Sequence, residues 1–291
     1  MSVTADKTAS ARKIVASITT LPPLPATAQE ILTCFGDEFI DADKVSAVIE
    51  GDPGICAKLL GVANSAYFGL IEPVHNIREA VSRVLGVDTV RSLVLAMAIQ
   101  RVFISKKCPA FDTTRFWMQG LLTAECCKTL ATADPSVPDA SRDLAHSAGL
   151  CHNIGLLALA HMEPERTHAA LRLHRANPEP GRLGKLLFRE FQSDHKIMTL
   201  ELARHWSLPQ PMIMAYQLRA LPHQADDDRF SLIIAAGTAV VGNTEVNDDQ
   251  QTDVGFWANA LSLTPADLQK MAVFGDRQKD RVQSLASNMS G

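Results

Sequence analysis

The chain has 291 residues, of which 46% are hydrophobic and 21% are charged, a composition typical of one large or two modest folded domains. A formal net charge of -4 and a pI of about 6.1 exclude a general basic field, so we expect no nucleic-acid partner. No apolar run approaches the roughly 18–20 residues of a membrane span, and the polar opening Met1–Lys7 lacks the pattern of an export signal. We therefore expect a cytoplasmic protein without a membrane span.

The first hundred residues carry helix signals almost throughout. Leu21–Pro25 predicts a stiff extended segment, because each proline fixes its own φ. Asp52 followed by Pro53 predicts a helix start, with the aspartate as N-cap and the proline in the first helical position. Gly86 predicts a helix end with a left-handed cap. The helices expected in this part cover about residues 26–35, 41–49 (capped by Asp41), 53–64, 77–85 and 90–102.

Lys106–Pro109 interrupts the helical pattern and is the candidate boundary between two halves. Asp112 predicts the cap of the next helix, and a later helix over residues 141–161 is expected to carry His152. The helices expected around them cover about residues 112–132, 164–177, 183–191, 194–206, from 211, 230–241 and from Pro265 onward.

Convincing strand alternation is hard to find, so the pattern predicts an all-α fold. We divide the chain into a lead-in over 1–20, an N-terminal helical half over 21–107, a second half over 108–222 and a helical extension over 223–291.

Short motifs stand in a fixed order along the chain. They are Leu21–Pro25, Asp52-Pro53 with Lys58–Leu60, Asn64–Gly69, Glu79-Ala80, Leu85-Gly86, Phe116-Trp117, Gly149–Gly155, and His195 with Trp206–Pro209. Each motif is weak alone, but the ordered series resembles the HDOD domains over about residues 15–220. The resemblance implies a multi-helical bundle like that of the HD phosphohydrolases, with an N-terminal helical subdomain. It also implies a regulatory role in bacterial signal transduction without catalysis.

The stretch Gly149–Gly155 resembles the metal-binding signature of the HD phosphohydrolases. Those enzymes hold metal ions with imidazoles and carboxylates, and the metal lowers the pKa of a bound water. Their adjacent histidine and aspartate are matched here by His152 and Asn153. The amide oxygen of Asn153 is neutral, whereas hard divalent ions favour charged oxygen ligands. The resemblance therefore implies no metal, no cofactor and no catalytic residue.

The other positions that match this metal cluster are also poor in charge. Gln119 lies near the place of the first histidine, His195 matches a later histidine, and Tyr216-Gln217 stand where many HDOD sequences keep a histidine pair. The resemblance thus implies a vestigial HD cleft that could bind a ligand, formed by Gln119, His152, Asn153, His195, Tyr216 and Gln217.

Three functions stay open from the sequence. The first is a non-enzymatic module that relays a signal by binding a signalling protein supplied in trans, possible also as a homodimer. The second is a metal-dependent phosphohydrolase acting on nucleotides or cyclic dinucleotides, and the third is a small-molecule sensor that uses the vestigial cleft. His152 can equally be a buried core histidine, while we expect His146 to be partly exposed and the cysteines to be reduced core thiols.

Overall fold

The computed structural model describes residues 23–33, 42–103, 105–179, 181–221, 228–241, 259, 261, 263–264 and 282–290. Within these ranges the chain forms helices joined by turns, and no strand occurs. The elements are α2 (Ala26–Thr33), α3 (Ala42–Glu50), α4 (Pro53–Ala63), α5 (Ile77–Glu79), the π-helical η1 (Ala80–Leu85), α6 (Val87–Val102), α7 (Thr113–Ala133), α8 (Asp139–Leu150), α9 (Ile154–Met162), α10 (Pro164–Ala176), α11 (Arg182–Phe191), α12 (His195–His205), α13 (Gln210–Ala220), α14 (Arg229–Val241) and a further helix over residues 282–290. The expected all-α class is confirmed.

Aspartate caps start the helices where the sequence predicts them. The Asp52 carboxylate accepts from the N–H groups of Gly54 (3.0 Å) and Ile55 (3.1 Å), with Pro53 in the first turn of α4. Asp112 accepts from an N–H in the first turn of α7 at 2.9 Å. The expected lead-in over 1–20, the cap at residue 41 and the helix start at residue 265 lie outside the described residues.

Gly86 ends a helix as expected, but with a different geometry. The last turn before it is a π turn, closed by the Gly86 N–H and the Val81 carbonyl at 2.9 Å. Gly86 has a positive φ of 75°, but its ψ of 156° takes it out of the left-handed helical region. The expected left-handed cap is therefore wrong, although glycine still suits the positive φ.

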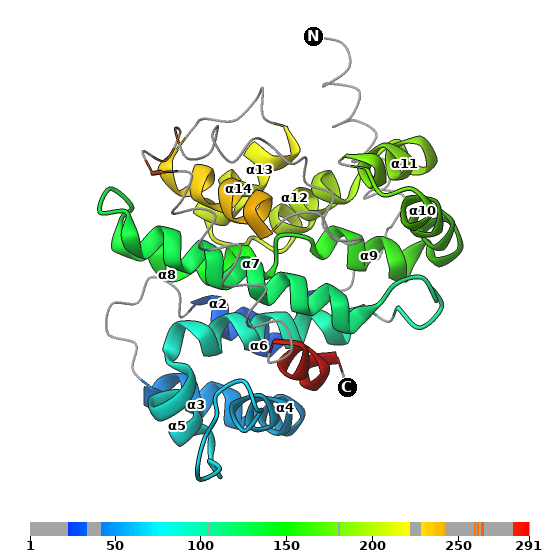
Figure 1. The fold of residues 1–291 in the computed structure, drawn as a ribbon. Coiled ribbons are helices and arrows are strands. Elements are labelled where there is room, and N and C mark those ends of the chain that lie inside the picture. Colours follow the sequence, from blue (N-terminus) through cyan, green and yellow to red (C-terminus); the bar gives the residue numbers. More distant parts are fainter. Residues whose placement is uncertain are drawn as a thin grey trace.

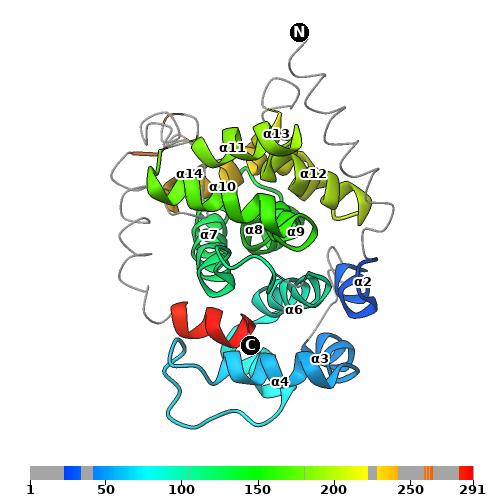
Figure 2. The ribbon, with the colours of Figure 1, turned by 90° about the vertical axis from the view of Figure 1, so that its right-hand side faces the viewer.

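The helices form stacked layers (Figures 1 and 2). The antiparallel pair α7 and α8 lies in the middle, α9 to α14 cover one side of it, and α6 with α2 to α5 lie on the other. Residues 90–99 of α6 are all buried, because α6 is packed between α8 and the helices α2 and α4. A single hydrophobic cluster runs from Leu24 to Met289. The boundary at residues 106–109 stays a prediction.

No helix in the described ranges is both long and apolar enough to cross a bilayer.

Candidate functional site

The stretch around His152 is a turn between two helices. α8 ends at Leu150 and α9 begins at Ile154, so the expected continuous helix over residues 141–161 is wrong. Asn153, at the start of α9, has φ -126° and ψ 19°, which no α-helix can contain. The His152 Nδ1 lies 2.7 Å from the Gly149 carbonyl oxygen, and because a carbonyl only accepts, Nδ1 carries the proton. This side-chain bond takes up a carbonyl that a continuing helix would need.

The two glycines of the signature let neighbouring helices approach the turn. A Cβ on Gly149 would lie 2.7 Å from the Ala124 Cα of α7. A Cβ on Gly155 would lie 2.2 Å from the His195 carbonyl oxygen and 2.5 Å from the Thr199 nitrogen, both in α12. The Gly155 N–H also donates to Thr199 Oγ1 at 2.9 Å. The glycines thus seat α7 and α12 against the two ends of the turn.

α13 supplies donors to the backbone on both sides of the turn. Tyr216 donates its hydroxyl to the Ala148 carbonyl at 3.0 Å, and Arg219 Nη1 donates to the His152 carbonyl at 2.7 Å. Burial raises the pKa of Tyr216 well above its ordinary value, so the phenol is neutral and can donate. These two bonds satisfy carbonyls that the break of the helix leaves open.

The remaining predicted cleft residues come from α7, from the N-cap of α9, and from α12 and α13. Gln119, Asn153 and His195 are all at most 3% exposed, while Gln217 is half-buried and accepts from Arg204 at 2.8 Å. α7 reaches the turn closely, since a Cβ on the residue after Gln119 would lie 2.9 Å from the Leu150 carbonyl oxygen. The same holds for α12, whose first residue is His195. That all six side chains share one cleft stays a prediction.

The polar groups at this turn do not fit a divalent cation. The predicted positions offer imidazole, amide and phenol groups but no carboxylate, and the Arg219 guanidinium already lies against His152. A fixed positive charge there would repel a dication. In the described ranges no three His, Cys, Asp or Glu side chains are grouped so that they could hold a metal.

Arg219 is the residue at this turn that sequence analysis missed. It lies three residues after Tyr216, so the two share a face of α13. That spacing could have indicated that the two side chains reach the same site. An arginine in a helical sequence ordinarily indicates a solvated side chain, however.

His146 is 1% exposed, so the expectation of partial exposure is wrong. It lies on α8, and its Nε2 is 3.5 Å from Glu125 Oε1 of α7. Burial would raise the pKa of Glu125, but the contact with His146 and the charge of Lys128 together outweigh it and the pKa is lowered. His146 therefore belongs to the α7–α8 interface.

The cysteines in the described ranges are free thiols, and all but Cys56 are buried. Burial raises the pKa of Cys126 and of Cys151 to about 12. Both are therefore protonated core side chains, and Cys151 is no thiolate partner for His152. Cys34 lies outside the described residues.

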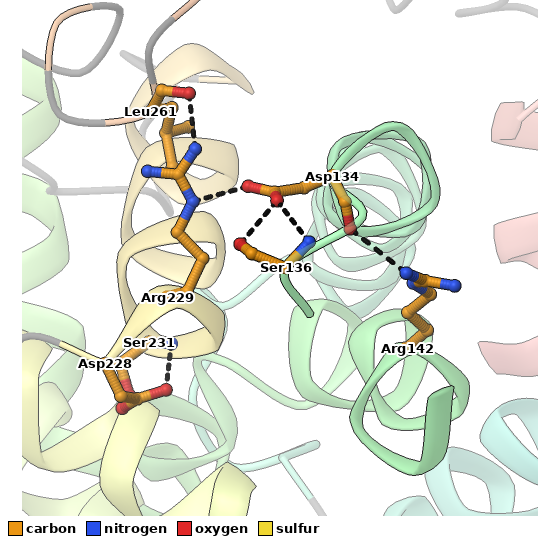
Figure 3. Close-up of polar contacts among 7 residues, drawn as sticks. All are labelled: Asp134, Ser136, Arg142, Asp228, Arg229, Ser231 and Leu261. Atoms are coloured by element: carbon orange, nitrogen blue, oxygen red, sulfur yellow. Dashed lines mark hydrogen bonds and ion pairs between the residues drawn. The ribbon is translucent and has the colours of Figure 1, made fainter. Parts of the chain in front are cut away.

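A separate pocket of about 230 Å³ lies where α7 ends against α14. Its polar wall is an ion pair between Asp134 and Arg229, and Arg229 also donates to the Leu261 carbonyl (Figure 3). Burial would raise the pKa of Asp134, but hydrogen bonds from Ser136 and Arg229 outweigh it and the pKa is lowered. Since these charges satisfy each other, we assign them to fold stability. None of the six predicted cleft residues lines this pocket.

Solved structures share this fold. A candidate signal-transduction protein of Marinobacter aquaeolei VT8 matches 93% of this chain and 60% of its own, with a TM-score of 0.80 and 24% identity. An HDOD domain protein of unknown function from Geobacter sulfurreducens matches over 97% of this chain and 98% of its own, with a TM-score of 0.76 and 16% identity. A candidate phosphohydrolase of Shewanella amazonensis SB2B matches over 94% of this chain and 97% of its own, with a TM-score of 0.68 and 21% identity.

Comparisons of sequence agree with the fold. An uncharacterised protein of Treponema pallidum (strain Nichols) is 26% identical over 220 residues, which is 75% of this chain and 41% of the relative. The chain thus spans less than two thirds of the length of this relative and of the Marinobacter protein. The model of the HDOD domain matches residues 21–221, more than half of the sequence. The chain belongs to the HDOD domain family.

Proposed function

We propose that this chain is a non-enzymatic regulatory module of bacterial signal transduction, which acts in the cytoplasm by binding another signalling protein. The observation that carries the proposal is the Arg219 bond to the His152 carbonyl, which sets a positive charge beside the HD-like turn. The neutral side chains of Gln119 and Asn153 add no compensating negative charge. Such a site suits a structural role better than metal-assisted hydrolysis.

Metal content and turnover test the absence of catalysis. We expect the purified protein to carry no stoichiometric iron, manganese or zinc, and to leave cyclic dinucleotides and an aryl phosphodiester intact. Asn153→Asp should gain no efficient turnover with manganese or iron, because the Arg219 charge and the Gln119 amide remain. One metal ion per chain that is lost in His152→Ala, or robust hydrolysis by either protein, would instead establish a phosphohydrolase.

Binding in trans is tested separately from catalysis. Affinity capture from the native cell should recover a signalling protein, and size-exclusion chromatography with light scattering should report whether a homodimer also forms. A protein that stays monomeric and captures no specific partner would contradict the proposed relay by protein binding.

A small-molecule sensor is the second candidate, and one observation favours it. Gln119 Oε1 and Thr123 Oγ1 are buried on α7 and have no hydrogen-bond partner among the described residues. They are four residues apart, so both lie on one face of α7. A bound molecule or water could satisfy them. Native mass spectrometry of the freshly purified protein tests this, since a retained small molecule would favour the sensor over the relay.

A further inference from the structure

α10 lies on the outside of the molecule and has two unlike faces. It is near the right-hand edge of the fold in Figure 1 and crosses the front of the molecule in Figure 2. Its inner face packs against α9 and α11, and the residues buried there are Thr167, Ala170, Leu171 and His174. The outer face is exposed and consists of Glu165, Ala169, Arg172, Leu173 and Ala176.

An apolar stripe runs along this outer face. Ala169, Leu173 and Ala176 are separated by four and then three residues, so they lie above one another along the helix. Leu173 is 53% exposed, and among the described helices α10 alone exposes a large hydrophobic side chain. A surface helix ordinarily keeps polar residues on its outer side. The stripe therefore indicates a face that packs against another molecule.

Charged side chains flank the stripe on both sides. Glu165 and Arg172 are exposed on one flank, seven residues apart, and neither has an ion-pair partner among the described residues. Arg166 lies on the other flank, where its Cζ is 4.5 Å from the centre of the Phe191 ring of α11. The Arg166 side chain is held over that ring but stays 47% exposed, so part of it remains accessible.

An antiparallel copy of α10 that crosses at Ala169 matches this arrangement. In a two-fold pair, each contact occurs twice and each flank faces the same flank of the partner. Glu165 precedes Ala169 by four residues and Arg172 follows it by three, so Glu165 comes level with the partner's Arg172. Leu173 likewise comes level with the partner's Arg166, whose aliphatic stem can cover an apolar side chain. The small Ala169 lets the two helices approach closely where they cross.

We propose that α10 is the interface of a homodimer, in which two copies of this helix pack antiparallel around Ala169. The dimer covers Leu173 of each copy and forms the ion pair between Glu165 and Arg172 twice. A helix of 13 residues is about 20 Å long. Contact along that length is small beside the roughly 800 Å² per partner that stable complexes bury. The dimer is therefore weak and reversible, and its population depends on the protein concentration.

Sedimentation of the full-length chain from micromolar to millimolar concentration measures the dimer. Leu173→Lys should raise the dimer dissociation constant about tenfold or more, because it replaces the apolar contact with a cation level with the partner's Arg166. Ile71→Lys is the matched control. Ile71 is 99% exposed in the loop after α4, on the other side of the α7–α8 pair, so this variant should dimerise like the wild type.

Two charge variants test the antiparallel pairing itself. Glu165→Lys and Arg172→Glu each bring like charges together twice per dimer, and each should weaken self-association about fivefold or more at low salt. An equimolar mixture of the two variants should recover dimers, because both contacts then join opposite charges. Recovery on mixing also shows that the two proteins are folded, since misfolded chains would not regain a specific interface.

Three results would overturn the proposed dimer. They are a wild type that is monomeric at every concentration, a folded Leu173→Lys that dimerises like the wild type, and a mixture that associates no more than its components. Loss of the dimer in Ile71→Lys alone would place the interface on the loop after α4 instead. If Leu173→Lys does not fold, the mixture of charge variants decides. The relay by a signalling protein is tested separately by affinity capture, so failure of the dimer leaves it standing.

Discussion

Replacing Gly155 with alanine would add a methyl group where α9 crosses α12. The added Cβ would lie 2.2 Å from the His195 carbonyl oxygen and 2.5 Å from the Thr199 nitrogen, whereas ordinary contact begins at 3.4 Å. Both of these atoms belong to the backbone, so the clash cannot be relieved by the rotation of a side chain. The two helices would have to separate by about an ångström in a close-packed interior.

The magnitude follows from two opposing effects. Overpacking of this kind costs about 1–3 kcal/mol, and a backbone obstacle places Gly155→Ala near the upper end. The higher helix propensity of alanine offsets about 1 kcal/mol of this loss of stability. We therefore expect a net loss of about 2 kcal/mol, which lowers the melting temperature by roughly 4–8 °C.

Thermal unfolding followed by circular dichroism measures the effect, and Gly61→Ala is its matched control. Gly61 lies inside α4, and a Cβ there meets nothing within 4 Å. That variant should be more stable than the wild type by about 0.5–1 kcal/mol. A Gly155→Ala protein as stable as the wild type would refute the close crossing of α9 and α12.

Three further predictions concern single side chains. Asp52→Ala should lower stability by about 0.5–2 kcal/mol through loss of the α4 cap, and an unchanged urea midpoint would contradict that role. Arg219→Met should cost about 1–3 kcal/mol, because the His152 carbonyl loses its donor, and a melting temperature equal to the wild type would argue against that bond. Burial and the charge of Asp88 raise the pKa of Asp143 above 3.8, the ordinary value of an aspartate, so the wild type should lose stability as pH rises from that value through the raised pKa. Asp143→Asn should therefore gain stability over the wild type across that window, and denaturation midpoints whose difference is constant with pH would contradict it.

Helix starts could be predicted because their causes are local. The cap and proline at Asp52-Pro53 and the cap at Asp112 need only the residues that follow them, and both were predicted correctly. The apolar run over residues 90–102 likewise predicted a helix, which the structure has as α6. In each case the signal lies within about one or two turns of the chain.

The break at residues 151–153 could not be predicted in the same way. Residues 141–161 contain no proline and have the apolar pattern of a continuous helix. The break depends on the His152 bond to the Gly149 carbonyl and on donors from α13, which lie 67 and 68 residues further along the chain than the carbonyls they bind. The expected partial exposure of His146 was wrong for a related reason, because its burial depends on packing against α7, whose Glu125 Oε1 lies 3.5 Å from His146 Nε2.

The turn between α8 and α9 joins helices that are distant in sequence. Its glycines admit α7 and α12, and its flanking carbonyls accept from Tyr216 and Arg219 of α13. In a metal hydrolase a cation would draw such elements together, whereas in this chain close backbone contact and hydrogen bonds do so. Substitution of His152 should therefore disturb the packing of several helices at once. A loss of partner binding in a His152 variant is evidence for a ligand site only where the melting temperature is unchanged.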